Sequence, residues 1–145
     1  MTELVKPTRP EFRNIHITDI VLRYRLPVAG IVSILHRVSG ALMFVLLPFI
    51  VWMLDTSISS EISFARFKAA FNVGMLGIPG VLWKLVALAL IWAYLHHFIA
   101  GLRHLWMDVS HAAVTKSFGR TSAVVTLVLS LGLTLVLGLK LFGVY

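Results

Sequence analysis

Apolar residues are concentrated in three long stretches, at about residues 28–56, 81–107 and 122–144, and polar residues gather between them. A helix that crosses a bilayer needs about 20 mainly apolar residues, so each stretch is long enough. Hydrocarbon offers no water to peptide groups, and a helix satisfies those groups within itself. The pattern therefore predicts an all-α membrane protein with three transmembrane helices, forming a single membrane-anchor domain over residues 1–145.

Two further segments flank these stretches. Residues 1–27 are polar and basic and lack the apolar run of a cleavable signal peptide. We therefore expect a cytoplasmic arm, followed by a helix that directs its own insertion. At about residues 61–75, phenylalanine and alanine are interleaved with charged residues, which predicts a short amphipathic helix at the membrane interface. Gly77, Pro79 and Gly80 are expected to end that helix.

The composition supports a membrane location, and the charge predicts a topology. Of the 145 residues, 59% are hydrophobic and 13% are charged, whereas a soluble domain carries roughly 25% charged residues. The formal net charge is +7, which topology and lipid headgroups explain better than nucleic-acid binding does. Basic residues mark the cytoplasmic side, which predicts a cytoplasmic N-terminus and an external C-terminus. The basic residues before or early in the first stretch are Lys6, Arg9, Arg13, Arg23, Arg25 and Arg37.

The absence of cysteine limits the chemistry. The chain contains no cysteine, so it forms no disulfide and supplies no thiolate to a metal or an iron–sulfur cluster.

In the third stretch small residues recur at every fourth position, as Thr126, Ser130, Thr134 and Gly138. Small residues on one helix face let helices approach closely in lipid, so we interpret this stripe as a packing surface.

The first candidate site lies in the sequence SILHRVSG, at the start of the first stretch. Ser33, His36, Arg37 and Gly40 have the spacing i, i+3, i+4 and i+7, which places them on one helix face. An ionisable group near hydrocarbon is costly and usually faces protein, water or a ligand. Arg37 alone is also explained by a side chain that reaches the headgroups. The serine and histidine on the same face favour a binding site.

The second candidate site lies in AYLHHFIAGLRHLWMD, within the middle stretch. His97, Gly101, His104 and Asp108 again share one helix face. A neutral imidazole is a common axial ligand of haem iron, so His97 is a candidate ligand. A histidine hydrogen-bonded to a neighbouring helix remains the alternative. Gly101, one turn away from His97, is expected to leave room for a flat macrocycle.

Geometry limits how a haem would be held. Two axial ligands approach iron from opposite sides, but His97 and His104 lie on one helix face, about 10 Å apart along the axis. His36 and Arg37 are expected nearer the cytoplasmic boundary than His97, which makes them poor candidates for the opposite axial position. They suit haem propionates better, because arginine binds carboxylates through paired hydrogen bonds. The second axial histidine is therefore expected from a partner polypeptide.

Two neighbouring residues complete this interpretation. His96 points about 100° away from its neighbour His97 on a helix with 3.6 residues per turn, and it is an alternative ligand. Its own face carries no glycine one turn away. Asp108 lies four residues after His104 and is a candidate to orient that imidazole.

With these motifs in view, the chain resembles the cytochrome b subunit of bacterial succinate dehydrogenase, the large membrane anchor of respiratory complex II. The family pattern is close to S-x-x-H-R-x-[ST]-G followed by H-x-x-x-G-x-R-H-L-x-x-D. The chain matches both parts, over Ser33–Gly40 and His97–Asp108, and has the preceding Arg9 and Pro10 as well. The resemblance extends over essentially the whole chain. It departs from the pattern at His96, which places a second histidine beside the expected ligand.

The resemblance implies a function and a set of site residues. Complex II passes electrons from succinate to ubiquinone, and a cytochrome b subunit pairs with a second three-helix anchor subunit around a shared haem b. By position in the motif, His97 would be this chain's axial ligand to the haem iron. His36, Arg37 and His104 would neighbour the propionates, and Ser33 and Arg37 would bind quinone. Flavin and iron–sulfur clusters would belong to the flavoprotein and iron–sulfur partner subunits.

Alternatives remain open at this point. The same architecture would suit the anchor of a quinol:fumarate reductase, in which electrons flow the other way. A haem-free structural anchor or a small channel subunit is a further alternative. In each case the isolated chain has no catalytic residues of its own, and the expected location is the bacterial inner membrane, because no transit peptide is evident.

Overall fold

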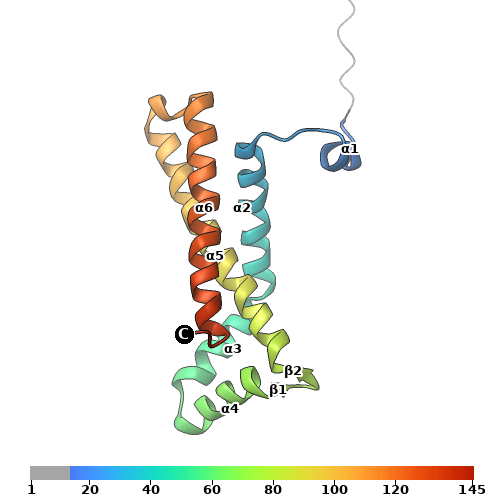
Figure 1. Cartoon of the computed structure of the whole chain (residues 1–145), viewed down its shortest axis with the longest axis vertical. Helices are drawn as coiled ribbons and strands as arrows, with labels where there is room; N and C mark the ends of the chain where they lie inside the picture. The colour runs from blue at the N-terminus through green and yellow to red at the C-terminus, as the bar shows by residue number, and fades with distance from the viewer. Residues whose placement is uncertain (1–13) are drawn as a thin grey trace, which may run out of the picture.

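The computed structural model describes residues 14–145, and helices make up most of that part of the chain (Figure 1). The expectations for Arg9 and Pro10, and for the first half of the basic arm, lie outside the described residues. In chain order the elements are α1 (Ile17–Leu22), α2 (Val28–Val45), α3 (Leu47–Ile58), α4 (Glu61–Asn72), β1 (Gly74–Met75), β2 (Ile78–Pro79), α5 (Gly80–Val109), the 3-10 helix η1 (His111–Ala113) and α6 (Lys116–Leu141).

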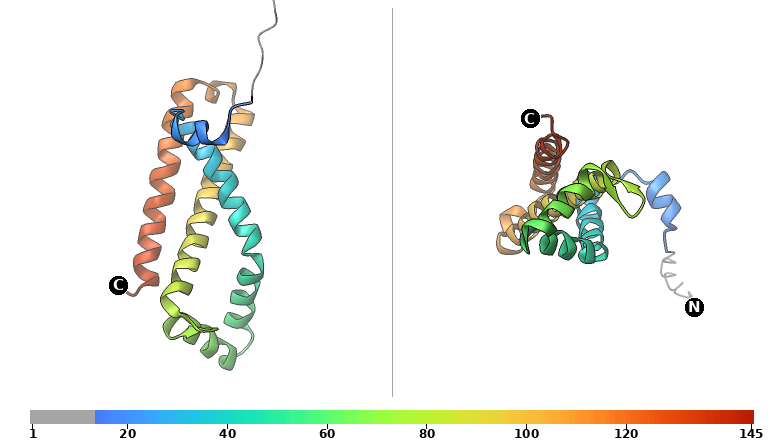
Figure 2. Two further views of the ribbon diagram at one scale, coloured as in Figure 1. Left: turned by 90° about the vertical axis from the view of Figure 1, so that its right-hand side faces the viewer. Right: turned by 90° about the horizontal axis from the view of Figure 1, so that it is seen from below.

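Three long helices, α2, α5 and α6, form an antiparallel bundle in which α2 and α6 run downwards and α5 runs upwards in the view of Figure 1 (Figures 1 and 2). α5 contacts both of the other helices. They have 18, 30 and 26 residues, and each is long and apolar enough to cross a membrane. Many of their large apolar side chains, such as Phe44, Leu129 and Leu135, are exposed on the single chain, as expected for surfaces that face lipid or partner chains. The predicted all-α membrane fold with three transmembrane helices is confirmed.

The first apolar stretch is divided into two helices. α2 ends at Val45, Leu46 leaves the helical conformation, and α3 begins at Leu47 with Pro48 in its first turn. Proline lacks the amide hydrogen that would continue α2, and its ring clashes with the preceding turn, so the chain changes direction there. The apolar pattern alone does not report this break, because Leu46 and Pro48 are both apolar.

The other helices also differ in length from the apolar stretches. α6 begins at Lys116, six positions before the expected start, because the hydroxyl of Thr115 caps it by accepting from the amide of Phe118. α4 ends at Asn72, since Gly74 adopts a positive φ of 131° that an α-helix does not contain. A short antiparallel hairpin, β1–β2, follows and leads directly into α5.

α4 lies across one end of the bundle, at the foot of the view in Figure 1. It begins with a capping box: Ser60 accepts from the amide of Ser63, and the side chain of Ser63 accepts from the amide of Ser60. Lys68 lies over the ring of Phe64 within the helix. At the opposite end of the molecule, α1 lies to one side of the bundle and is joined to the start of α2 by a linker (Figures 1 and 2).

Small side chains let the three long helices approach one another. Val32 of α2, Ala100 of α5 and Ala123 of α6 form a shared buried cluster. A β-carbon added at Gly138 would lie 2.9 Å from a methyl group of Leu88, so the side chain of Leu88 packs into the space that this glycine leaves. The small-residue stripe of α6 is thus largely buried against α5, in keeping with a packing surface.

Candidate functional site

The candidate site is a seam between α2 and α5 lined by three imidazoles. The ring of His36 stacks on that of His97, with centroids 4.1 Å apart and planes inclined by 23°. On its other side, His36 meets His104 at 5.2 Å with a 40° tilt. His36 therefore lies between the two histidines of α5, which are two turns apart. Among the described residues, these side chains do not form a cluster able to hold a bare metal ion.

This contact corrects one expectation from the sequence. His36 was expected nearer the membrane boundary than His97, but the two rings lie at the same level. α2 and α5 run in opposite directions, and their packing places residue 36 beside residue 97. The stacked arrangement still separates their roles, because two rings packed face to face cannot bind one iron from opposite sides.

The hydrogen bonds of His97 determine which ring nitrogen is available. Its Nδ1 lies 2.9 Å from the main-chain carbonyl of His36 and 3.3 Å from the hydroxyl of Ser39. The carbonyl only accepts, so Nδ1 carries the hydrogen and donates it. Ser39 donates its own hydrogen to the same carbonyl at 2.8 Å. The Nε2 atom of His97 therefore carries a free lone pair, and no described residue donates to it.

Such a bond is the arrangement expected of a metal-binding histidine. A histidine that binds metal usually donates its second ring hydrogen to a carbonyl or a carboxylate, which orients the ring and raises its basicity. The donor set at His97 thus fits an axial ligand for haem iron through Nε2. Ser39, which supports the same carbonyl, was not singled out from the sequence; its only signal was its place in SILHRVSG.

Two glycines shape the seam. A β-carbon at Gly40 would lie 2.9 Å from Cε1 of His97, closer than real side chains approach, so the imidazole occupies the space that Gly40 leaves. A β-carbon at Gly101 would lie 3.7 Å from Nε2 of His36. Gly101 was expected to leave room for a macrocycle beside His97. In the single chain the only side-chain atom this close to that position is Nε2 of His36, at ordinary contact distance, so the expectation stays a prediction.

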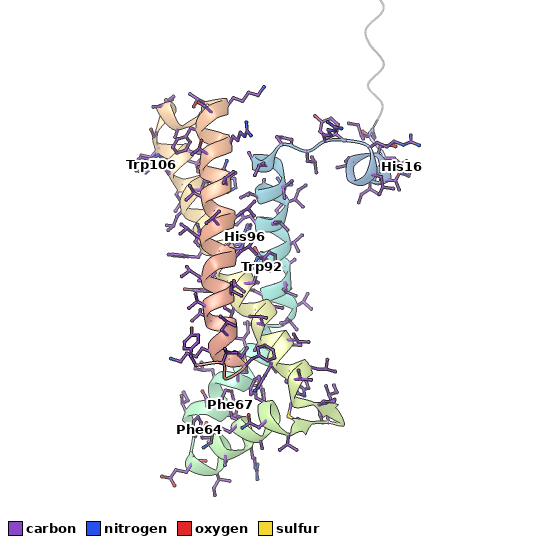
Figure 3. All side chains as sticks on the ribbon, in the orientation of Figure 1. His16, Phe64, Phe67, Trp92, His96 and Trp106 are labelled. Carbon is purple, nitrogen blue, oxygen red and sulfur yellow. The ribbon has the colours of Figure 1, made fainter. Side chains whose placement is uncertain are left out.

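His96 faces a different helix. It is fully buried, and its Nδ1 lies 3.2 Å from the hydroxyl of Ser130 on α6. Its ring stacks on Trp92, one turn earlier in α5, and both side chains point into the bundle (Figure 3). Its Nε2 is buried and has no partner among the described residues. No ligand approaching from outside the chain reaches this imidazole, which favours His97 over His96 as a ligand.

The remaining predicted site residues lie on the edges of the seam. Ser33 is half-buried and Arg37 is exposed, one turn apart on the same face of α2. Neither side chain forms a hydrogen bond within the part of the chain that the structure describes. Asp108 is also exposed, and no bond joins it to His104, which is half-buried. These polar groups therefore remain available to a ligand or a partner chain.

Arg103 has a role that sequence reasoning did not assign. Its side chain is buried between α5 and α6, where Nε donates to the hydroxyl of Ser122 at 2.9 Å and a terminal nitrogen donates to the carbonyl of Gly119 at 3.3 Å. It joins the end of α5 to the first turns of α6. Its position one residue before His104, on a different helix face, was the available signal.

The fold and the seam together define a small multi-pass membrane protein in which two antiparallel helices hold a row of histidines. The chain belongs to the succinate dehydrogenase/fumarate reductase transmembrane subunit family, whose model matches residues 9–137. The match covers α2, α5, most of α6 and both histidine motifs. The resemblance noted from the sequence is therefore confirmed.

Curated relatives support the same assignment. The chain is 30% identical over 101 residues to the succinate dehydrogenase cytochrome b556 subunit of Paracoccus denitrificans, covering 68% of this chain and 71% of the relative. It is 31% identical over 108 residues to the cytochrome b556 subunit of Coxiella burnetii, covering 74% and 81%. The corresponding subunit of Rickettsia felis is 26% identical over 98 residues.

Proposed function

We propose that this chain is the cytochrome b anchor subunit of a succinate dehydrogenase, that it binds haem b together with a second anchor subunit, and that it helps to form the ubiquinone-reduction site. The observation that carries the proposal is the hydrogen bond from Nδ1 of His97 to the carbonyl of His36, which leaves Nε2 as a free, oriented ligand atom. Haem b, when bound, supplies a centre that takes up and releases one electron. Family membership and the names of the relatives agree with this proposal.

The residues around His97 suit the acidic edge of a haem. The half-buried ring of His36 lies between His97 and His104, and a propionate bound at this edge of the seam would accept a hydrogen bond from an imidazole N–H. His104 lies next to His36, and the exposed guanidinium of Arg37 follows His36 directly on α2. We assign these three side chains to the propionates, since arginine and imidazole N–H groups both pair well with carboxylates.

Ser33 and Arg37 are proposed to bind the quinone. The half-buried hydroxyl of Ser33 can donate to a quinone carbonyl, and Arg37 can stabilise the negative charge that develops on that oxygen as electrons arrive. Both side chains lie at the open edge of α2, where a partner subunit would close the pocket. Asp108 lies four residues after His104, and its proposed role is to orient that imidazole in the assembled complex.

The proposal implies several partners. His36 and His97 are stacked on one side of the seam, so the second axial histidine would come from the other anchor subunit. This cysteine-free chain supplies no thiolate for iron–sulfur clusters, so an iron–sulfur subunit and a flavoprotein subunit would deliver the electrons. The distribution of basic residues favours a cytoplasmic N-terminus, with the assembly in the bacterial inner membrane.

A spectrum of the purified native assembly tests the proposal. We expect a reduced-minus-oxidised absorption difference with the band of a b-type haem, and turnover from succinate to ubiquinone. Absence of the band would favour a haem-free anchor. Faster turnover of fumarate with a low-potential quinol than of succinate with ubiquinone would favour the fumarate reductase alternative.

A further inference from the structure

The β1–β2 hairpin carries a residue that its backbone does not favour. Leu76 and Gly77 form its two-residue turn, with φ angles of 56° and 75°. A turn with two positive φ angles favours Asn-Gly, because a leucine β-carbon is crowded in the left-handed conformation. Leu76 nevertheless occupies the first position, and its side chain is 83% exposed on the chain. Neither the turn nor packing within the chain explains a leucine there.

The hairpin is held firmly against the start of α5. The indole nitrogen of Trp83 donates to the carbonyl of Met75 at 3.3 Å, and the amide of Gly80 donates to the carbonyl of Val73 at 3.3 Å. A β-carbon at Gly80 would lie 2.5 Å from the carbonyl oxygen of Phe71, so the chain is closely packed at this junction. The tip therefore projects sideways from the foot of α5 in a defined direction (Figure 1).

The exposed surface of the hairpin continues that of a membrane helix. Val73 and Leu76 are more than 80% exposed, and Ile78 is also exposed. No residue from 73 to 79 is charged. Val81 and Leu82, in the first turn of α5, extend the same exposed apolar surface into a helix that spans the bilayer. The continuity of this apolar surface with a spanning helix favours contact with lipid.

Trp83 and Lys84 indicate the depth of this region. Tryptophan is enriched at the boundary between hydrocarbon and headgroups. The ammonium group of Lys84 lies over the ring of Phe142 just after α6, and charged groups of spanning helices concentrate near this boundary. Because Trp83 bonds to the hairpin directly, the hairpin lies at the level of this boundary. Leucine in that zone gains by leaving water, and this gain offsets the unfavourable backbone conformation.

We propose that the hairpin of residues 74–79 is a lipid-interface anchor, in which the side chain of Leu76 inserts into the boundary between headgroups and acyl chains at this end of the bundle. The anchor would fix the depth of α5 in the bilayer. This anchor depends only on the membrane fold and not on haem or quinone binding. The anchor proposal and the proposed function can therefore fail independently.

Site-directed spin labelling of the assembled complex in phosphatidylcholine–phosphatidylglycerol vesicles tests this anchor. The chain has no cysteine, so Leu76→Cys introduces one thiol into it, and the signal from partner subunits is removed by subtracting the unsubstituted complex. Oxygen concentrates in the bilayer, whereas a nickel chelate stays in water. We expect a several-fold higher ratio of oxygen to nickel accessibility at residue 76 than at Ser59→Cys, in the polar turn before α4.

Two results would overturn the proposal. A ratio equal to that at Ser59 would place Leu76 in water, and protection from both reagents would show that a partner subunit covers the hairpin. If Leu76→Cys does not assemble, Val73→Cys reports on the same exposed surface and the same outcomes apply.

Discussion

The imidazole of His36 stacks on that of His97 at 4.1 Å, although the two residues are 61 positions apart in the chain. The main-chain carbonyl of His36 also accepts the Nδ1 hydrogen of His97. Residue 36 thus contacts the candidate ligand through its ring and through its backbone. The orientation of His97 on α5 is consequently determined by α2, so a change on either helix is expected to alter the spectrum of the proposed haem.

Replacing His97 by alanine removes the proposed ligand atom. We expect His97→Ala to abolish the b-type band of the purified assembly, or to shift it if the partner's ligand retains the haem. His96→Gln is the matched control, because His96 bonds to Ser130 and faces away from the seam. A normal spectrum in His97→Ala, with loss of the band in His96→Gln, would reverse the assignment.

A substitution at Gly40 tests how the imidazole of His97, the proposed haem ligand, is packed. Gly40→Ala adds a methyl group 2.9 Å from Cε1 of His97, so the ring must move and the haem band should weaken or shift. Gly132→Ala, on α6, is the control, since a β-carbon there meets nothing within 4 Å. The absorption spectrum and the haem-to-protein ratio measure both variants. Equal spectra would show that the contact does not orient the ligand.

Ser33 and Arg37 are expected to affect quinone reduction more than haem content. Ser33→Ala removes a hydrogen-bond donor, and Arg37→Ala removes a charge that stabilises the reduced quinone oxygen. For Ser33→Ala we expect succinate–quinone turnover to fall by a factor of at most about 100 to 1000, because loss of one donor to a developing oxyanion costs about 2.7–4 kcal/mol. Arg37→Lys should restore part of the activity lost in Arg37→Ala. Wild-type turnover in both alanine variants would contradict the pocket assignment.

The buried bond between His96 and Ser130 is expected to stabilise the bundle. Ser130→Ala leaves a fully buried imidazole without its partner, at a cost of about 1–3 kcal/mol. The midpoint of thermal unfolding of the purified assembly should fall. Thr134→Ala is the control, because that hydroxyl bonds only to a carbonyl within its own helix. A larger effect at Thr134 than at Ser130 would show that the bond between helices contributes little.

Much of the fold and part of the site were predictable from local patterns. The apolar stretches are long enough to require membrane helices, and helical spacing alone placed Ser33, His36 and Arg37 on one face. The same spacing grouped His97 with His104 and set His96 apart, which agrees with the different helices that these side chains contact. These features depend only on residues within one or two turns of each other.

Contacts between helices were not predictable in the same way. Three contacts depend on the axial register of α2 against α5. They are the depth of His36 relative to His97, the contact between Gly40 and His97, and the contact between His36 and Gly101. That register depends on the break near Pro48, on the hairpin that leads into α5 and on the small residues at the helix contacts. No periodicity within a single helix contains this information.

The sequence by itself determined that this is a three-helix membrane protein of the succinate dehydrogenase/fumarate reductase family. The length of each apolar stretch and the spacing of residues within a short motif are local properties, so they can be read without knowing how the helices pack. The tertiary structure alone decided which imidazole is oriented by a carbonyl and which is buried against α6. The physical reason is that a hydrogen bond or a stacked ring requires a partner at contact distance, and for His97 and His96 that partner lies on another helix.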